Sequence, residues 1–106
     1  IISGGVNIYP AEIEAALATH ELVADVSVFG VPNDEFGEEV KAAVELVDGT
    51  DPAAAEVELR NACRATLAGY MVPRSFDFGP LPRTPTGKLP KRLLRAKYWE
   101  GTGRNI

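Results

Sequence analysis

The stretch LVADVSVFGVPNDEFGEEVKAAVELV, residues 22–47, decides the fold. It opens with a β-branched, alternating run, which predicts a strand over residues 22–30. A loop is predicted over residues 31–38, because Pro, Asn, Asp and Gly cluster in VPNDEFGE. The segment EVKAAVELV alternates again and predicts a second strand over residues 39–47. Two strands joined by so short a loop favour an antiparallel pair.

Helical patterns flank this pair of strands. YPAEIEAALATH predicts a helix over residues 9–20, with its proline in the first turn. A second helix is predicted from about Pro52 to Leu67, and a third begins at Pro90. Before the third helix, RSFDFG predicts a short third strand over residues 74–79. The order α-β-β-α-β-α predicts an α+β fold, a two-layer sandwich in which helices pack on a small mixed three-stranded sheet.

The same patterns divide the side chains between core and surface. The only cysteine, Cys63, lies in the apolar face of the second helix, so we interpret it as a core residue rather than a nucleophile or metal ligand. We interpret His20 as a cap at the end of the first helix, and we expect Tyr98 and Trp99 to fasten the last helix. In the second strand, Val40, Ala42, Val44 and Leu46 are expected to point inward, and Lys41 and Glu45 outward.

Length and composition indicate one soluble domain. The chain has 106 residues, of which 45% are hydrophobic and 25% charged, and no apolar run approaches the about 18 residues that a membrane span needs. A single cysteine cannot form a disulfide within the chain and favours a reducing, cytoplasmic setting. Because the chain opens at Ile1 within an apolar pattern, we expect it to be a piece of a longer protein.

The net charge of −4 conceals an asymmetry. Residues 78–99 contain no acid and six basic residues, whereas the remainder holds five basic residues against fifteen acids. A local basic segment on an acidic body favours attraction to a compact anion or to an acidic neighbouring domain. Nucleic acid would more often come with a basic face across the whole domain, so we do not expect it as a partner.

The basic segment contains LPRTPTGKLPKRLLR, residues 81–95. It is not a P-loop, because Pro82 stands where that motif needs its first glycine and Leu89 follows the lysine in place of a hydroxyl residue. The ingredients of an anion grip are nevertheless present, since Gly87 allows close approach of the backbone and Lys88 offers a mobile positive charge. From these residues alone, a solvated loop lysine and an anion-binding lysine both stay open.

Two further stretches have a functional and a structural interpretation. Paired glycines in SGGVNIYP, residues 3–10, allow close approach to a ligand or form a tight turn that leads into the first helix. The acids of residues 34–39 lack the alternating spacing of a calcium loop, so we expect a solvated edge and no metal site.

Taken together, IISGGVNIYPAEIE at the start and LPRTPTGKLPKRLLR near the end resemble two signature motifs of the adenylate-forming superfamily. This superfamily includes acyl-CoA synthetases, luciferases and the adenylation domains of peptide synthetases. The resemblance covers Ile1 to Trp99 and includes VFGVPNDEFGEEVKAAV between the motifs.

The resemblance implies that residues 1–106 are the small C-terminal domain, the lid, of a larger ligase. Its partner would be the enzyme's own N-terminal domain, which binds ATP, Mg²⁺ and the carboxylic acid and is absent from this sequence. The ATP-dependent, AMP-forming enzyme makes an acyl-adenylate and then an acyl-CoA thioester, with ATP and CoA as substrates. Lys88 occupies the position of the catalytic lysine that serves the adenylation step, and the lid alone would be inactive.

The resemblance also implies cofactor-binding residues. Gly4, Gly5 and Val6 would line the tunnel for the pantetheine arm of CoA, and a side chain at position 5 would obstruct it. The segment Val72, Pro73 and Arg74 would lie near the nucleotide part of CoA, with Arg74 as a phosphate contact. The chain departs from some relatives at Phe36, where they carry an arginine that meets CoA.

Within the superfamily, SGGVNIYPAEIE and PRTPTGK are most similar to fatty-acyl-CoA synthetases. Peptide-synthetase domains commonly start with a GxRIE type of motif and carry NGK at the lysine. Two alternatives stay open: a carrier-protein-dependent adenylation domain, and a non-catalytic module whose basic tail binds acidic partners.

Overall fold

A β-hairpin forms the centre of the fold in the computed structural model, which describes residues 1–100. The predicted antiparallel pair is present as β3 (Val23–Asn33) and β4 (Gly37–Leu46). The loop predicted over residues 31–38 is wrong over most of its length, because β3 continues through Pro32, which pairs with Glu38. Proline is tolerated there because β3 is the edge strand of the sheet.

The turn of this hairpin is short because an asparagine side chain closes it. Asn33 Oδ1 accepts hydrogen bonds from the backbone amides of Glu35 and Phe36, at 2.9 and 2.7 Å. These two side-chain hydrogen bonds replace backbone pairing at the tip, a role that asparagine commonly has in turns. Phe36 is therefore presented at one end of the hairpin.

The sheet has five strands, two more than predicted. The third predicted strand is present as β5 (Ser75–Phe78), which runs parallel to β4 and makes the sheet mixed as expected. The two additional strands, β1 (Ile2–Ser3) and β2 (Val6–Asn7), form a short antiparallel hairpin beside the beginning of β4. Strands of two residues carry no detectable alternation, so the sequence pattern could not reveal them.

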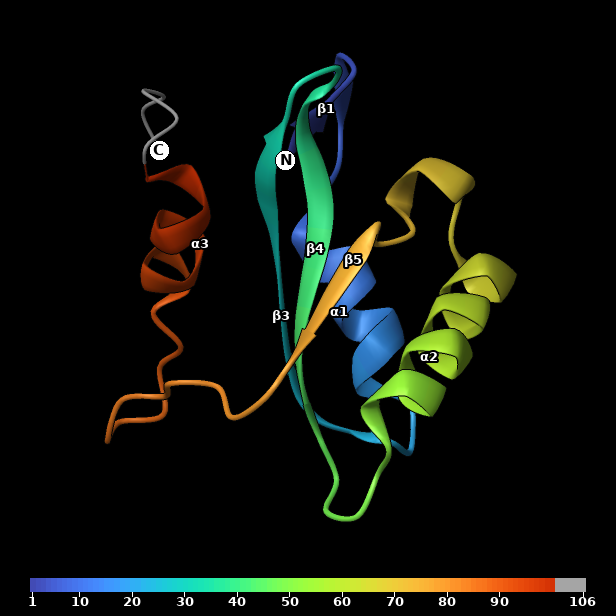
Figure 1. Cartoon of the computed structure of the whole chain (residues 1–106), viewed down its shortest axis with the longest axis vertical. Coiled ribbons are helices and arrows are strands. Elements are labelled where there is room, and N and C mark those ends of the chain that lie inside the picture. Colours follow the sequence, from blue (N-terminus) through green and yellow to red (C-terminus); the bar gives the residue numbers. More distant parts are fainter. Residues whose placement is uncertain (101–106) are drawn as a thin grey trace.

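Two helices cover one face of the sheet (Figure 1). They are α1 (Pro10–Ala18) and α2 (Pro52–Thr66), and α2 begins where Asp51 Oδ2 accepts from the backbone amide of Ala54 at 3.2 Å. The largest core lies beneath them, with Val28, Val40, Ala42 and Val44 of the sheet packed against Ile13, Leu17, Leu59 and Cys63. Cys63 is 1% exposed, which confirms its interpretation as a core residue.

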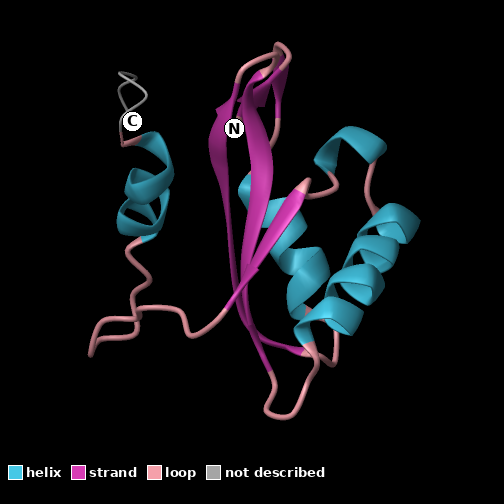
Figure 2. Ribbon diagram, in the orientation of Figure 1, coloured by secondary structure: helices cyan, strands magenta, loops and turns pink. Residues whose placement is uncertain are grey.

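The third helix, α3 (Lys91–Trp99), packs on the opposite face (Figure 2). The α+β prediction is confirmed, and α3 adds a layer to the two that were expected. Lys41 was expected to point outward, yet it is only 9% exposed because α3 covers this face. Its ammonium pairs with Asp77 at 2.9 Å and lies 4.8 Å from the centre of the Tyr98 ring.

The expectation that aromatic residues fasten α3 is confirmed. Trp99 donates from Nε1 to the carbonyl of Gly30 at 3.0 Å, and the Tyr98 ring lies 5.9 Å from that of Phe29. His20 lies at the end of α1, as predicted, and caps it through its backbone. The backbone amide of His20 donates to the carbonyl of Leu17 at the end of α1, at 3.0 Å, whereas its side chain closes the next turn, with Nδ1 accepting from the amide of Leu22 at 3.1 Å.

Candidate functional site

Lys88 lies in a closed turn on the connection between β5 and α3. We call residues 84–88 the Lys88 loop. The amide of Gly87 donates to the carbonyl of Thr84 at 2.8 Å, and the amide of Thr84 donates to the carbonyl of Lys88 at 2.7 Å. Thr84 Oγ1 accepts from the amide of Lys88 at 3.1 Å. The turn requires glycine at position 87, where φ is +88°.

The side chain of Lys88 lies on the surface of the domain. The residue is exposed, and its ammonium has no hydrogen bond or ion pair with any residue in the described range 1–100. A positive charge that is unpaired and borne on an ordered turn can reach an anion on another molecule or domain. The geometry is therefore compatible with the anion-binding interpretation, and the catalytic role stays a prediction.

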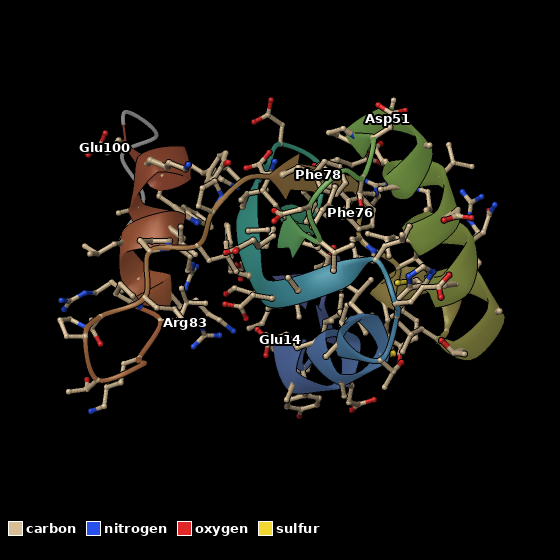
Figure 3. The ribbon with its side chains drawn as sticks, turned by 90° about the horizontal axis from the view of Figure 1, so that it is seen from below. Glu14, Asp51, Phe76, Phe78, Arg83 and Glu100 are labelled. Carbon is tan, nitrogen blue, oxygen red and sulfur yellow. The ribbon has the colours of Figure 1, made fainter. Side chains whose placement is uncertain are left out.

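The base of the Lys88 loop is tied to the sheet. Arg83 donates from Nη2 to Asp25 of β3 at 2.6 Å and from Nη1 to the carbonyl of Gly87 at 2.8 Å. Glu45 of β4 accepts from the amide of Leu81 at 3.1 Å. The hydrogen bond from Arg83 lowers the pKa of the Asp25 carboxyl below its ordinary value. Figure 3 shows Arg83 on the side of the loop that faces the rest of the domain.

The paired glycines form the turn between β1 and β2. Gly4 and Gly5 have φ values of +57° and +82°, which is the left-handed conformation that a two-residue hairpin turn needs. The amide of Gly4 donates to the carbonyl of Phe36 at 2.9 Å, so the two hairpin tips are joined. A Cβ atom at Gly5 would meet nothing within 4 Å, which leaves the space beside it open.

Next to these tips lies a hollow of about 350 Å³. It brings together residues that were predicted separately, because Gly4 lines it together with Val72 and Arg74. The Arg74 guanidinium lies 4.8 Å from the centre of the Phe36 ring, a distance at which a cation is attracted to the face of an aromatic ring. The other lining residues are Ser3, Val40, Gly69 and Tyr70.

A second hollow of about 360 Å³ continues from the first, since the two share Gly69, Val72 and Arg74. It adds Arg60 and Arg64 from α2, and we call the two hollows together the arginine groove. Arg60 pairs with Glu56 of the same helix at 3.0 Å and donates to the carbonyl of Arg74 at 3.5 Å. Three guanidinium groups in one groove favour a polyanionic ligand.

Sequence reasoning missed Arg60 and Arg64. Their spacing of four residues placed them on one side of α2, but the groove that they line forms only when α2 lies beside residues 69–74. Pro73 lines the second hollow with its side chain among the fully buried ones, so it shapes the groove from beneath. Gly5 and Val6 lie on the β1–β2 hairpin next to the first hollow but do not line it.

The two candidate sites lie far apart on the domain (Figure 1). The tips of the β1–β2 and β3–β4 hairpins are at one end of the long axis, whereas the connection between β5 and α3, which carries the Lys88 loop, lies at the side of the domain toward the other end. The geometry therefore separates the predicted catalytic residue from the predicted cofactor-binding residues.

Residues 1–100 were also compared with the requirements of a metal site, a reactive thiol and a membrane span. No group of three or more His, Cys, Asp or Glu side chains in this range could hold a metal ion. Burial raises the pKa of the Cys63 thiol, which keeps it protonated inside the core. No helix in the same range has the length and the apolar content that crossing a bilayer requires.

Comparison with known proteins gives a consistent result. The model of the AMP-binding enzyme C-terminal domain matches residues 12–88. An acetate–CoA ligase of Humulus lupulus is 42% identical over 103 residues, which cover 94% of this chain and 18% of that protein. A 2-succinylbenzoate–CoA ligase of Bacillus pumilus is 47% identical over 98 residues, which cover 92% of this chain and 19% of that protein.

Among solved structures, a fatty acyl CoA synthetase of Mycobacterium tuberculosis superposes with a TM-score of 0.81 at 37% sequence identity. The match covers 92% of this chain and 19% of that one. The chain thus spans less than a fifth of the length of the curated relatives that it matches.

Proposed function

Because this chain belongs to the family of AMP-binding enzyme C-terminal domains, we propose that it is the mobile C-terminal domain, the lid, of an AMP-forming acid–CoA ligase. The separation of the Lys88 loop from the arginine groove is the observation that carries the proposal. A ligase of this kind performs two reactions, adenylation of an acid and transfer of the acyl group to a thiol. A domain with one site at each end can serve them in turn by changing its orientation.

In the first reaction, we assign to Lys88 the stabilisation of charge. A carboxylate must attack the α-phosphate of ATP and displace pyrophosphate, so two anions meet. The ammonium of Lys88 would bind oxygens of both and offset their repulsion, and this interaction would strengthen as the new bond forms. The exposed and unpaired state of Lys88 supports this role, because a lysine paired within its own domain could not reach another domain.

In the second reaction, we assign to the arginine groove the binding of CoA. Arg74, Arg60 and Arg64 would hold the phosphates of its nucleotide part. The turn of Gly4 and Gly5, with Val6 beside it, would admit the pantetheine arm, since a Cβ atom at Gly5 would meet nothing within 4 Å. Phe36 replaces the arginine of some relatives, and its ring orients Arg74 over the groove.

The identity of the acid would be determined outside this domain. The relatives named above act on acetate and on 2-succinylbenzoate, so similarity in this domain does not select one acid. From the sequence motifs we propose that the substrate is a fatty acid, which assays with a panel of acids would test. We also propose that the enzyme is cytoplasmic, which fractionation of cells would test. ATP would be bound mainly by the N-terminal domain, and Mg²⁺ with it, because residues 1–100 offer no set of metal ligands.

The proposal is tested on the full-length enzyme that carries this domain. Replacing Lys88 by Ala is expected to lower the rate of adenylation, measured as ATP–pyrophosphate exchange, by about a hundredfold or more. Transfer to CoA from supplied acyl-adenylate is expected to stay near the wild-type rate. Arg92→Ala is the matched control, because it removes another exposed positive charge of the same segment. Equal losses in both reactions would contradict the assignment.

The acceptor is tested separately. Supplying free CoA and a phosphopantetheine-loaded carrier protein in parallel identifies which one receives the acyl group. Transfer to the carrier protein alone would establish the alternative adenylation domain. An enzyme unaffected by Lys88→Ala, with salt-sensitive binding of acidic proteins by this domain, would instead establish a non-catalytic binding module.

A further inference from the structure

We propose that Arg83 is a positioning residue for Lys88, and that Asp25 and Glu45 of the sheet hold Arg83 and the base of the Lys88 loop in place. This inference rests on the function proposed above, because it assigns the groups that direct the ammonium of Lys88 toward its target. It concerns side chains that lie far from Lys88 in the sequence and do not themselves touch a substrate.

The first observation is the double attachment of Arg83. Its guanidinium pairs with Asp25, 58 residues away in the chain, and also donates from Nη1 to the carbonyl of Gly87 at 2.8 Å. Gly87 immediately precedes Lys88. One planar group thus connects a strand of the sheet to the residue next to the lysine, and only the fork of arginine can make both contacts at once.

The second observation is the arrangement of the strands beneath the loop. Asp25 and Glu45 are direct cross-strand partners on β3 and β4. A register shift between Val23 and Asp25 marks a β-bulge, which turns Val23 and Val26 toward the core while Asp25 faces the loop. Two like charges placed opposite each other repel, and a cation close to both reduces that repulsion.

Arg83 and the loop backbone supply that compensation. The Arg83 guanidinium binds Asp25 and also experiences the charge of Glu45. Glu45 in turn accepts from the amide of Leu81 at 3.1 Å, two residues before Arg83. The loop is therefore attached at two points on adjacent strands, and its internal hydrogen bonds between Thr84 and Lys88 carry that orientation to the lysine.

The position of these contacts argues for a role in orientation rather than in holding the fold together. The side chain of Arg83 is 43% exposed, and exposed ion pairs contribute little to stability. The core beneath α1 and α2 does not include it. What the contacts do restrict is the direction of an otherwise exposed loop, and a catalytic group that is displaced by about 1 Å can lose much of its effect.

The test uses Asp25→Asn and Arg83→Lys in the full-length enzyme, with Asp48→Asn as the matched control for loss of an exposed carboxylate. We expect each of the two variants to lower the rate constant of adenylation about tenfold with little change in KM. Thioester formation from supplied acyl-adenylate and the melting temperature are expected to stay near wild type. Asp25→Glu, which keeps the carboxylate, is expected to restore most of the adenylation rate.

A second measurement does not depend on catalysis. In the 106-residue chain, ¹⁵N relaxation of the Lys88 amide is expected to show an ordered backbone that becomes mobile in Asp25→Asn and stays ordered in Asp48→Asn. Unchanged order at Lys88 together with unchanged adenylation would overturn the positioning role and leave the proposed function intact. Equal losses in both half-reactions with a lowered melting temperature would also overturn it, because they indicate a structural role.

Lys88→Ala in the same assays separates the two proposals. If it leaves adenylation unchanged, the proposed function fails, and the positioning role fails with it. If it lowers adenylation while Asp25→Asn and Arg83→Lys do not, only the positioning role fails.

Discussion

The Lys88 loop and the arginine groove are built in opposite ways. The loop is one short segment closed by hydrogen bonds between Thr84, Gly87 and Lys88, and it presents a single unpaired charge. The groove is assembled from three parts of the chain, the β1–β2 turn, the tip at Phe36 and the segment from α2 to Arg74. Its charges are several, and two of them lie over aromatic rings, Arg74 over Phe36 and Arg60 over Phe76.

The difference teaches what each site can do. A single mobile ammonium recognises little by shape, so its effect depends on being delivered to a place where charge develops. A hollow with several arginines and an open backbone turn can select a large anionic ligand before any reaction starts. The comparison predicts that damage at one end should leave the reaction at the other end intact.

The largest expected effect at the groove end comes from filling the space beside the glycine turn. We expect Gly5→Leu to slow thioester formation about a hundredfold, because the side chain would enter the path of the thiol arm. Adenylation is expected to continue. The measurement is single-turnover transfer from acyl-adenylate to CoA.

Gly49→Leu is the matched control for this variant. Gly49 has φ of +84°, close to the +82° of Gly5, and its Cβ would also meet nothing within 4 Å. Both variants should therefore lose a similar free energy of unfolding, about 1–2 kcal/mol, from the left-handed backbone. If Gly49→Leu slowed thioester formation as much as Gly5→Leu, strain rather than obstruction would be the cause.

A smaller effect is expected from Arg74→Ala. Loss of one guanidinium should raise the KM for CoA about tenfold, equivalent to about 1.4 kcal/mol, and should weaken its dependence on salt. The KM for ATP in adenylation should not change. Steady-state kinetics at several salt concentrations provide the measurement, and an unchanged KM for CoA would show that the groove binds something else.

The smallest effect is expected in the pH dependence of stability at the loop end. Arg83 lowers the pKa of Asp25 in the folded state below its ordinary value of 3.8. A carboxyl with a depressed pKa stabilises the fold above that value, and this contribution is lost as the pH falls through the folded-state pKa. The difference in free energy of unfolding between wild type and Asp25→Asn should therefore be constant near neutral pH and shrink below pH 3.8.

Denaturant titrations across this range provide the measurement. A difference between the two proteins that stayed the same down to the lowest pH would show that the ion pair does not shift the titration of Asp25.

Local patterns were sufficient for the centre of the fold and for the turns that carry glycine. Alternation in β3 and β4 predicted the antiparallel pair, and helical spacing predicted α1 and α2. The burial of Lys41 was missed. Alternation assigns side chains to two faces of the sheet, but it does not show that α3 covers the second face. The extension of β3 through Pro32 was missed for a different reason. Proline is tolerated within a strand only at the edge of a sheet, and the local pattern does not reveal that β3 is an edge strand.

The candidate site shows the same division. Lys88, Gly4 and Gly5 stand in local motifs, so the sequence could indicate them. The contact of Arg83 with Asp25 joins residues 58 positions apart, and no local pattern records such a pair. The groove formed by Arg60 and Arg64 depends in the same way on how α2 lies beside residues 69–74.

The central claim is that the two ends of this domain serve two different reactions. Its most direct test measures adenylation and thioester formation separately in Lys88→Ala and Arg74→Ala forms of the full-length enzyme. The account predicts that Lys88→Ala loses adenylation and keeps thioester formation, and that Arg74→Ala does the reverse at limiting CoA. Two variants that impaired the same reaction, or both reactions equally, would contradict it.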